Sequence, residues 1–451
     1  MNRSRQELFE SSSIPKAFFA LTIPTVLGKI VMLLYNMADT WFIAATGNAS
    51  LVAGVSLCGP IFMLMIAIGD IFGVGGSSVI SRLFGRGETE EAGRVSSFCF
   101  YGALAGGVLT GAILLLFQTP ILRLLGADGE TFPYAVEYYR YIAIGAPLIV
   151  TSIVPLNLLR SEGMAKASMF GSALGSVVNI ILDPIFIFKL NMGAAGAAVA
   201  TVLGNVAAMA LYLYFILRKA RVLNVSLAKI AKKREMIIPV FLIGIPASLN
   251  NLTQSFATAL CNRFLLLYGS DKIAAAGIAS RISMIAAMMI VSFAFGALPL
   301  VGYAYGKGDR PKLKAIIKFF YTFQFCMSTV VALILGGLSR FLVAAFMDEP
   351  AILAAGTAIL RWQLVGMPFI SVVLVSTCIF QASGKSGPTL VLSLSRQGVV
   401  YLAVIVIANA LFGYNGVIAA QPAADFLSAV LAVVLLARTL GKEWHTSRTD
   451  E

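Results

Sequence analysis

Charged residues are scarce in this chain. Only 12% of its 451 residues are Asp, Glu, Lys or Arg, whereas 59% are hydrophobic. The mean hydropathy of +0.88 lies far above that of a soluble domain with a polar surface. The composition therefore excludes an ordinary soluble globular protein and indicates a polytopic membrane protein.

The chain also has only one histidine and no closely spaced pair of cysteines. The single histidine, His445, lies in the polar C-terminal tail, so the apolar runs offer no histidine as metal ligand or general base. The five cysteines form no CxxC pair and fall within apolar runs, which indicates small core residues without a disulfide or metal site. The segment "GKSGPT" at 384–389 resembles the end of a phosphate-binding loop. The first glycine of that motif is replaced by Ile379, so no ATPase motif is present. We expect no cofactor.

Long apolar runs are abundant. Each has roughly the 20 residues that a helix needs to cross a bilayer, whereas a transmembrane barrel would show alternating segments of about 10 residues. We predict an all-α membrane protein with twelve transmembrane helices. The first run is too long for a signal peptide, so we expect no cleavage. The predicted spans are 17–44, 51–80, 95–117, 134–158, 168–188, 194–217, 237–266, 273–303, 315–346, 355–380, 388–411 and 415–437.

Lysine and arginine gather in alternate loops. With the N-terminus inside, 24 of the 34 basic residues fall in cytoplasmic segments, 4 in outside loops and 6 in spans. The linker "RKARVLNVSLAKIAKKRE" alone carries seven. The positive-inside rule therefore predicts a multi-pass protein of the cytoplasmic (inner) membrane with both termini cytoplasmic, and it accounts for the net charge of +13 without a nucleic-acid partner.

The two halves of the chain are similar to each other at an offset of 220 to 223 residues. For example, "RYIAIGAPL" matches "RWQLVGMPF", and Gly85 matches Gly306. Because each half has six spans, the repeat is parallel and predicts two pseudo-symmetric six-helix bundles. We predict an N-terminal lobe at 1–217, a basic cytoplasmic linker at 218–236 and a C-terminal lobe at 237–451. A duplicated bundle favours a transporter over an enzyme with one site.

Four acids lie deep within the predicted spans: Asp39, Asp70, Asp183 and Asp425. Each charge costs at least about 2.5 to 3.5 kcal/mol at bilayer depth, so an acid there suggests a function. Amides and a hydroxyl accompany them at helical spacing in the first half: Asn36, Asn157, Asn179, Thr201 and Asn205. The second half has Val400 and Val404 where the first has Asn179 and Asp183, so this polar set is kept in one half only.

This asymmetry predicts an ion-coupling site formed by Asp39, Asp183, Asn179, Thr201 and Asn157. Asn36, Asn205, Asp70 and Asp425 are accessory candidates, although single amides in spans often only bond neighbouring helices. Two carboxylates in a low-dielectric pocket repel each other, so one can hold a proton near neutral pH. Carboxylate, amide and hydroxyl oxygens equally suit sodium, so both ions stay open.

Other residues in the spans have simpler interpretations. Pro24 precedes Asp39 by fifteen residues in the same span, where proline predicts a helix bend. The six bases within spans lie mostly near span ends, where their side chains can reach the membrane surface. They are Lys29, Arg140, Arg263, Arg281, Arg361 and Arg396.

Several segments resemble the multidrug and toxic compound extrusion (MATE) family, and the resemblance covers residues 15–440. The most specific are "NIILDPIFIF" and "LVGYAYGKGD", with "IPTVLGKIVMLLYNMADTWFIAATG" and "GVGGSSVISRLFGRG" in support. The resemblance is strongest to the DinF-like branch, which holds its acids in the first lobe. It implies a V-shaped central cavity between two lobes and an ion site at Asp39, Asn179, Asp183 and Thr201, with Asn157 less secure.

The resemblance implies export of organic cations and dyes in exchange for protons or sodium. We expect a monomer whose partners are small amphipathic cations and membrane lipid. A lipid-linked saccharide flippase of the same superfamily is an alternative, but few bases lie deep in the spans to bind a pyrophosphate. A membrane-embedded enzyme is a further alternative, but no nucleophile or histidine motif supports it.

Overall fold

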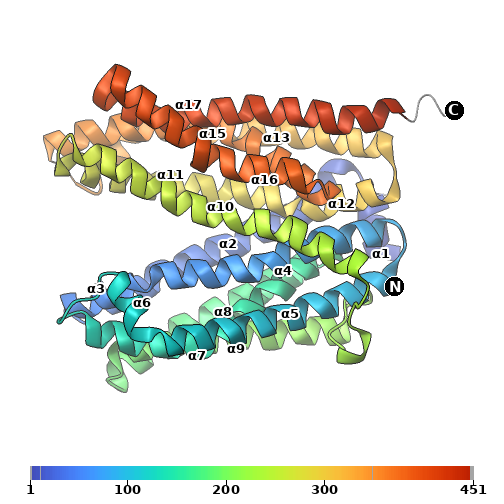
Figure 1. Ribbon diagram of the computed structural model, residues 1–451, viewed down its shortest axis with the longest axis horizontal. Coiled ribbons are helices and arrows are strands. Elements are labelled where there is room, and N and C mark those ends of the chain that lie inside the picture. The colour runs from blue at the N-terminus through green and yellow to red at the C-terminus, as the bar shows by residue number, and fades with distance from the viewer. Residues whose placement is uncertain (1–2, 11, 348, 447–451) are drawn as a thin grey trace. The chain divides into compact units, whose positions relative to one another are not determined.

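The computed structural model describes residues 3–10, 12–347 and 349–446, and every regular element in these ranges is helical. Eleven helical segments are long and apolar enough to cross a membrane. One of them, Ser386–Thr439, has 54 residues, which would measure about 80 Å as a straight helix and exceed the bilayer core of roughly 30 Å. Its backbone leaves the helical conformation at Gly413 (φ 56°), and Gly416 lies against the carbonyl of Ala408, so the chain reverses there (Figure 1). The prediction of twelve crossing segments is confirmed.

The chain divides into two compact units. The first comprises Met1–Ser248 and Gly302–Gly308, and the second comprises Leu249–Val301 and Asp309–Glu451. The predicted lobe limits at 217 and 237 stay a prediction. Helices of the first half are α1 (Arg3–Glu10), α2 (Ile14–Ala44), α3 (Ala49–Leu57), α4 (Gly59–Gly85), α5 (Thr89–Leu116), α6 (Gln118–Leu124), α7 (Phe132–Ser161), α8 (Ala165–Pro184) and α9 (Gly193–Arg218).

The second half follows the same pattern after a 3-10 turn at Leu227–Lys229. A π-helical turn follows α8 at Ile185–Lys189, and another follows α16 at Ser395–Val399. The helices are α10 (Arg234–Leu266), α11 (Ser270–Gly296), α12 (Leu298–Lys307), α13 (Arg310–Gly337), α14 (Ser339–Ala344), α15 (Pro350–Ser383), α16 (Ser386–Leu394) and α17 (Val400–Thr446).

Several predicted spans differ in detail from the observed helices, as two of them illustrate. The predicted span 315–346 is too long, because α13 ends at Gly337 and α14 forms separately; the pair Gly336 and Gly337 favours a helix end there. The predicted span 51–80 is divided at Cys58 into α3 and α4. Pro60 stands in the first turn of α4, where its missing N–H costs no helical hydrogen bond.

Small residues bring the helices of the first unit close together. Helix α7 contacts α4, α5 and α9, and α8 contacts α2 and α9 (Figure 1). Gly107 packs against the backbone of Pro147, and Gly175 and Gly204 each approach the other's carbonyl oxygen. In a membrane, such close backbone contact supplies packing energy that hydrophobic burial cannot supply between helices. In the second unit, α15 has the corresponding central place and contacts α11, α13 and α17.

The short N-terminal helix α1 packs on the end of α12 within the first unit. The ring of Phe9 is fully buried and stacks on Tyr303 with a centroid distance of 4.8 Å. Glu10 accepts hydrogen bonds from the Tyr303 hydroxyl at 2.8 Å and from Lys307 Nζ at 2.6 Å. These contacts join the C-terminal end of α12 to the rest of the first unit.

Repeat-related glycines form a reciprocal contact beside α1. A Cβ on Gly85 would collide with the carbonyl of Tyr303, and one on Gly306 would collide with the carbonyl of Arg82. We expect Gly85→Ala and Gly306→Ala each to destabilise the protein by about 1–3 kcal/mol, because overpacking forces the backbones apart. The measurement is the thermal unfolding midpoint in detergent.

Gly336→Ala in α13 is the matched control for the glycine prediction, since nothing lies within 4 Å of the Cβ it would add. It should leave stability unchanged or raise it by up to about 1 kcal/mol. A Gly85→Ala protein that melts like the wild type would show that this contact is not part of the stable fold.

Candidate functional site

Asp39 on α2 and Asp183 on α8 meet inside the first unit. Their carboxyl groups lie within hydrogen-bonding reach of each other. Asp183 has no solvent-exposed surface and Asp39 is half-buried. One oxygen of each, Oδ1, is buried and has no hydrogen-bond partner among the described residues. Two charged carboxylates would repel strongly in this position, so a proton or a cation between them stabilises the pair.

Asn179 and Thr201 complete the surroundings of Asp183. Both are buried, with 2% and 3% of their surface exposed. The amide of Asn179 satisfies both its atoms when the nitrogen donates to Asp183 Oδ2 at 3.0 Å and the oxygen accepts from the Thr201 backbone N–H at 3.0 Å. The opposite orientation offers only a contact of 3.3 Å from the nitrogen to the Thr201 hydroxyl. We therefore assign the first orientation.

The local backbone explains how Asp183 is presented. Pro184 lacks an N–H, so α8 cannot continue its hydrogen-bond pattern, and the π-helical turn Ile185–Lys189 follows at once. Pro24 lies within α2, which runs as one continuous helix from Ile14 to Ala44. The hydroxyl of Thr25 donates to the Leu21 carbonyl at 2.9 Å in the turn beside this proline.

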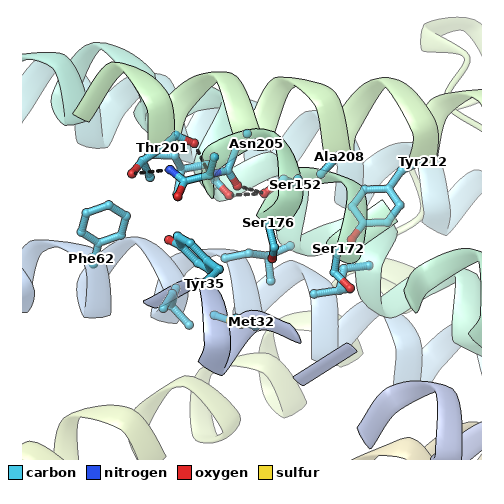
Figure 2. A pocket seen from close by; sticks show the side chains of 17 residues that line it. Met32, Tyr35, Phe62, Ser152, Ser172, Ser176, Thr201, Asn205, Ala208 and Tyr212 are labelled. Carbon is cyan, nitrogen blue, oxygen red and sulfur yellow. Dashed lines mark hydrogen bonds between the residues drawn. The ribbon is translucent and has the colours of Figure 1, made fainter. Parts of the chain in front are cut away.

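A cavity of about 160 Å³ opens next to the acid pair. Its wall comes from α2, α4, α7, α8 and α9 and is mostly apolar. Figure 2 shows Tyr35 and Phe62 near Thr201, while Ser172 and Tyr212 lie at the opposite end. Such a mixture of apolar wall and few polar groups is typical of small-molecule sites.

Asn205 belongs to the wall of this cavity. Its side chain accepts a hydrogen bond from the Ser152 hydroxyl at 3.0 Å and donates to the Thr201 carbonyl at 2.9 Å (Figure 2). These bonds tie α7 to α9 and hold the backbone of Thr201 in place.

Two residues named with the acid pair have other surroundings. Asn157 donates to the Ile153 carbonyl at 2.9 Å and accepts from Arg160 Nη2 at 2.7 Å, so both its side-chain atoms are occupied away from the carboxyls. The side chain of Asn36 is exposed. Helical spacing predicted a face for each residue, but the neighbour at that face depends on helix packing.

Tyr35 and Tyr138 are neighbours of the acid pair that the sequence interpretation did not select. Both phenols lie close enough to Asp39 and Asp183 to interact electrostatically with them. Tyr35 precedes Asp39 by four residues on α2, and this spacing could have identified it. Tyr138 comes from α7, and nothing in its local sequence indicated this contact.

Asp425 lies in the second unit and forms an ion pair. Its Oδ1 accepts from Arg396 Nε at 2.8 Å and from Gln421 Nε2 at 3.1 Å, and the carboxyl side chain is 1% exposed. At the repeat offset of 220 to 221 residues, Arg396 and Asp425 correspond to Gly175 and Asn205, which both line the cavity of the first unit. The ion pair thus occupies positions that border open space in the other half.

The assignment of the embedded bases to span ends is wrong for Lys29 and Arg396. Arg396 is paired with Asp425. Lys29 stands at the middle of α2, 15 residues from either end, which is roughly 22 Å of helix. Asp70 is close enough to Lys29 and to Arg160 to interact electrostatically with both. Asp70 therefore belongs to a group of charged residues apart from the acid pair.

Comparison with known proteins agrees with this architecture. The MatE family model matches the chain twice, at residues 24–185 and 246–407, which are the two repeats. The multidrug export protein MepA of Staphylococcus aureus is 30% identical over 433 residues, with 95% of this chain and 94% of that protein covered. MepA of Staphylococcus saprophyticus is 29% identical over 428 residues with the same coverage.

Solved structures show the same similarity. A crystal structure of MATE in the bent conformation has a TM-score of 0.93 and 28% identity, covering 99% of this chain and all of the other. An outward-facing multidrug resistance MATE family transporter of the MOP superfamily has a TM-score of 0.88 and 28% identity, covering 95% and 96% of the two chains. From its two family matches and its membrane-crossing helices, we conclude that this multi-pass membrane protein belongs to the MatE family.

Proposed function

We propose that this protein is a secondary active exporter that exchanges amphipathic, mostly cationic organic compounds for protons or sodium. The buried pair Asp39 and Asp183 beside the cavity is the observation that carries this proposal. An exporter needs one group whose charge changes with the coupling ion and a nearby space for the substrate. The relatives named as multidrug export proteins support the same function for this chain.

The coupling chemistry follows from the pair itself. A proton between the carboxyls relieves their repulsion, and losing it restores a negative charge that attracts a cationic substrate. In the assigned orientation, the oxygen of Asn179 is taken by the Thr201 N–H and the nitrogen faces Asp183. Sodium would need this amide to turn its oxygen toward the ion, so the arrangement supports proton coupling more than sodium coupling.

The orientation in the membrane is part of the proposal. The split of 24 basic residues in the segments assigned inside against 4 outside supports cytoplasmic termini in a cytoplasmic membrane. Substrates would then leave the cytoplasm while the coupling ion enters.

Dye efflux from proteoliposomes tests the function. We expect ethidium to be moved against its gradient when an inward proton gradient is imposed. In a separate measurement on the same preparation, a sodium gradient is imposed instead. Transport under the pH gradient alone would assign the proton. A protein that moves none of a broad panel of dyes under either gradient would contradict multidrug export.

A further inference from the structure

Lys29 is a basic residue at the middle of the long apolar helix α2. At the midpoint of α2 it is too far from either end for its side chain to reach the membrane surface. Its ammonium has one hydrogen-bond contact among the described residues, a weak one of 4.0 Å to the sulfur of Met32. An ionisable group at this depth normally has a function, and neither the acid pair nor the helix packing uses this one.

Arg160 brings a second positive charge to the same region. Only 8% of its surface is exposed. Its side chain folds back along α7, donating from Nε to the Leu156 carbonyl at 3.1 Å and from Nη2 to Asn157 at 2.7 Å. These two bonds leave further N–H groups of the guanidinium available. Asp70 is the nearby acid that interacts electrostatically with both bases, so Lys29, Arg160 and Asp70 form a group of two bases and one acid.

This basic group adjoins one end of the cavity. Met32, which contacts Lys29, lines the cavity, as do Leu156 and Tyr212 beside Arg160. Thr201 and Asn179 form the other end, next to Asp183. Thr201 and Tyr212 are 11 residues apart on α9, or about 16 Å. The cavity therefore extends from the neighbours of the acid pair to the neighbours of the basic group.

We propose that Lys29 and Arg160 form a subsite for an anionic group of the substrate, so that amphiphiles carrying both a cation and a carboxylate are preferred over their esters. This inference rests on the proposed export function. Met32 has a flexible thioether that can move aside and let a carboxylate reach the ammonium. Because the site is largely shielded from water, an ammonium gains more from a carboxylate there than it would at the surface.

A matched pair of dyes tests the subsite. A rhodamine with a free benzoate and its methyl ester differ in the negative charge and in one methyl group. Binding of each to the purified full-length protein is measured by fluorescence anisotropy, and efflux of each is measured in proteoliposomes. We expect Lys29→Met to weaken binding of the acid by about tenfold and to change binding of the ester by less than about twofold.

The controls separate charge from packing. Lys29→Arg keeps the charge and should keep the preference for the acid. Lys16→Met removes an exposed base from the start of the same helix and should leave the binding of both dyes unchanged. If Lys29→Met weakens the binding of both dyes equally, or changes the binding of neither, the proposed subsite is wrong, whether or not the dyes are exported. Absence of efflux together with a changed binding ratio would contradict export and keep the subsite.

Discussion

Replacing Asp183 or Asp39 with asparagine is expected to lower gradient-driven dye efflux by at least about tenfold, which corresponds to roughly 1.4 kcal/mol in the barrier of the rate-limiting step. Asparagine keeps the size of the side chain but cannot take up or release a proton. The charge change that makes one conformation preferable to the other is then gone. Because Asp183 is fully buried and Asp39 is half-buried, we expect the larger loss from Asp183→Asn.

The measurement is the initial rate of dye efflux from proteoliposomes with equal amounts of reconstituted protein. Asp128→Asn is the matched control, since Asp128 lies in the loop between α6 and α7 and its exposed carboxylate only accepts hydrogen bonds from Thr131. Insertion and thermal unfolding of each variant should match the wild type. If Asp39→Asn moves dye at the wild-type rate under both gradients, its role in coupling must be abandoned.

Removing Arg396 is expected to produce the largest loss of stability among the changes considered. Arg396→Leu leaves Asp425 with a buried charge and without its cation, and breaking a buried pair in this way costs about 3–5 kcal/mol. The unfolding midpoint in detergent should therefore drop markedly. Asp425→Asn should also lower it, while reducing efflux less than the changes at Asp39 and Asp183.

The double variant Arg396→Leu with Asp425→Leu distinguishes a structural pair from a coupling pair. Replacing both partners by apolar residues removes the unpaired charge, so most of the stability should return. Efflux at a temperature where the double variant is folded should return with it. A double variant that is stable but fails to transport would show that the pair of Arg396 and Asp425 takes part in transport.

The number and approximate positions of the crossing segments could be predicted from the sequence. A bilayer requires about 20 apolar residues per helix, and this constraint acts along the chain, without reference to any partner. The two repeats, and the retention in one half of the polar set that contains Asn179 and Asp183, followed from comparing the halves with each other. The closeness of Asn179 to Asp183 was also predictable, because four residues make about one helical turn.

The partners of the polar side chains were decided by tertiary structure. Asn157 has the residue type and depth expected for the acid pair, but its side chain bonds within α7 itself, to the Ile153 carbonyl and to Arg160. Lys29 and Arg396 both looked like bases near span ends, but one lies beside the cavity wall and the other pairs with Asp425. A helical repeat defines which residues share a face, whereas the residue opposite that face comes from another part of the chain.

The end of α12 illustrates the same limit. By sequence, Gly302–Gly308 belongs to the second repeat, yet this segment packs in the first unit through Phe9, Glu10 and the contact of Gly85 with Tyr303. Hydropathy and spacing determine where a helix lies along the chain and which side is apolar. Contacts between residues some 200 or 300 positions apart depend on shape and hydrogen-bond geometry at close range, which a local pattern does not contain.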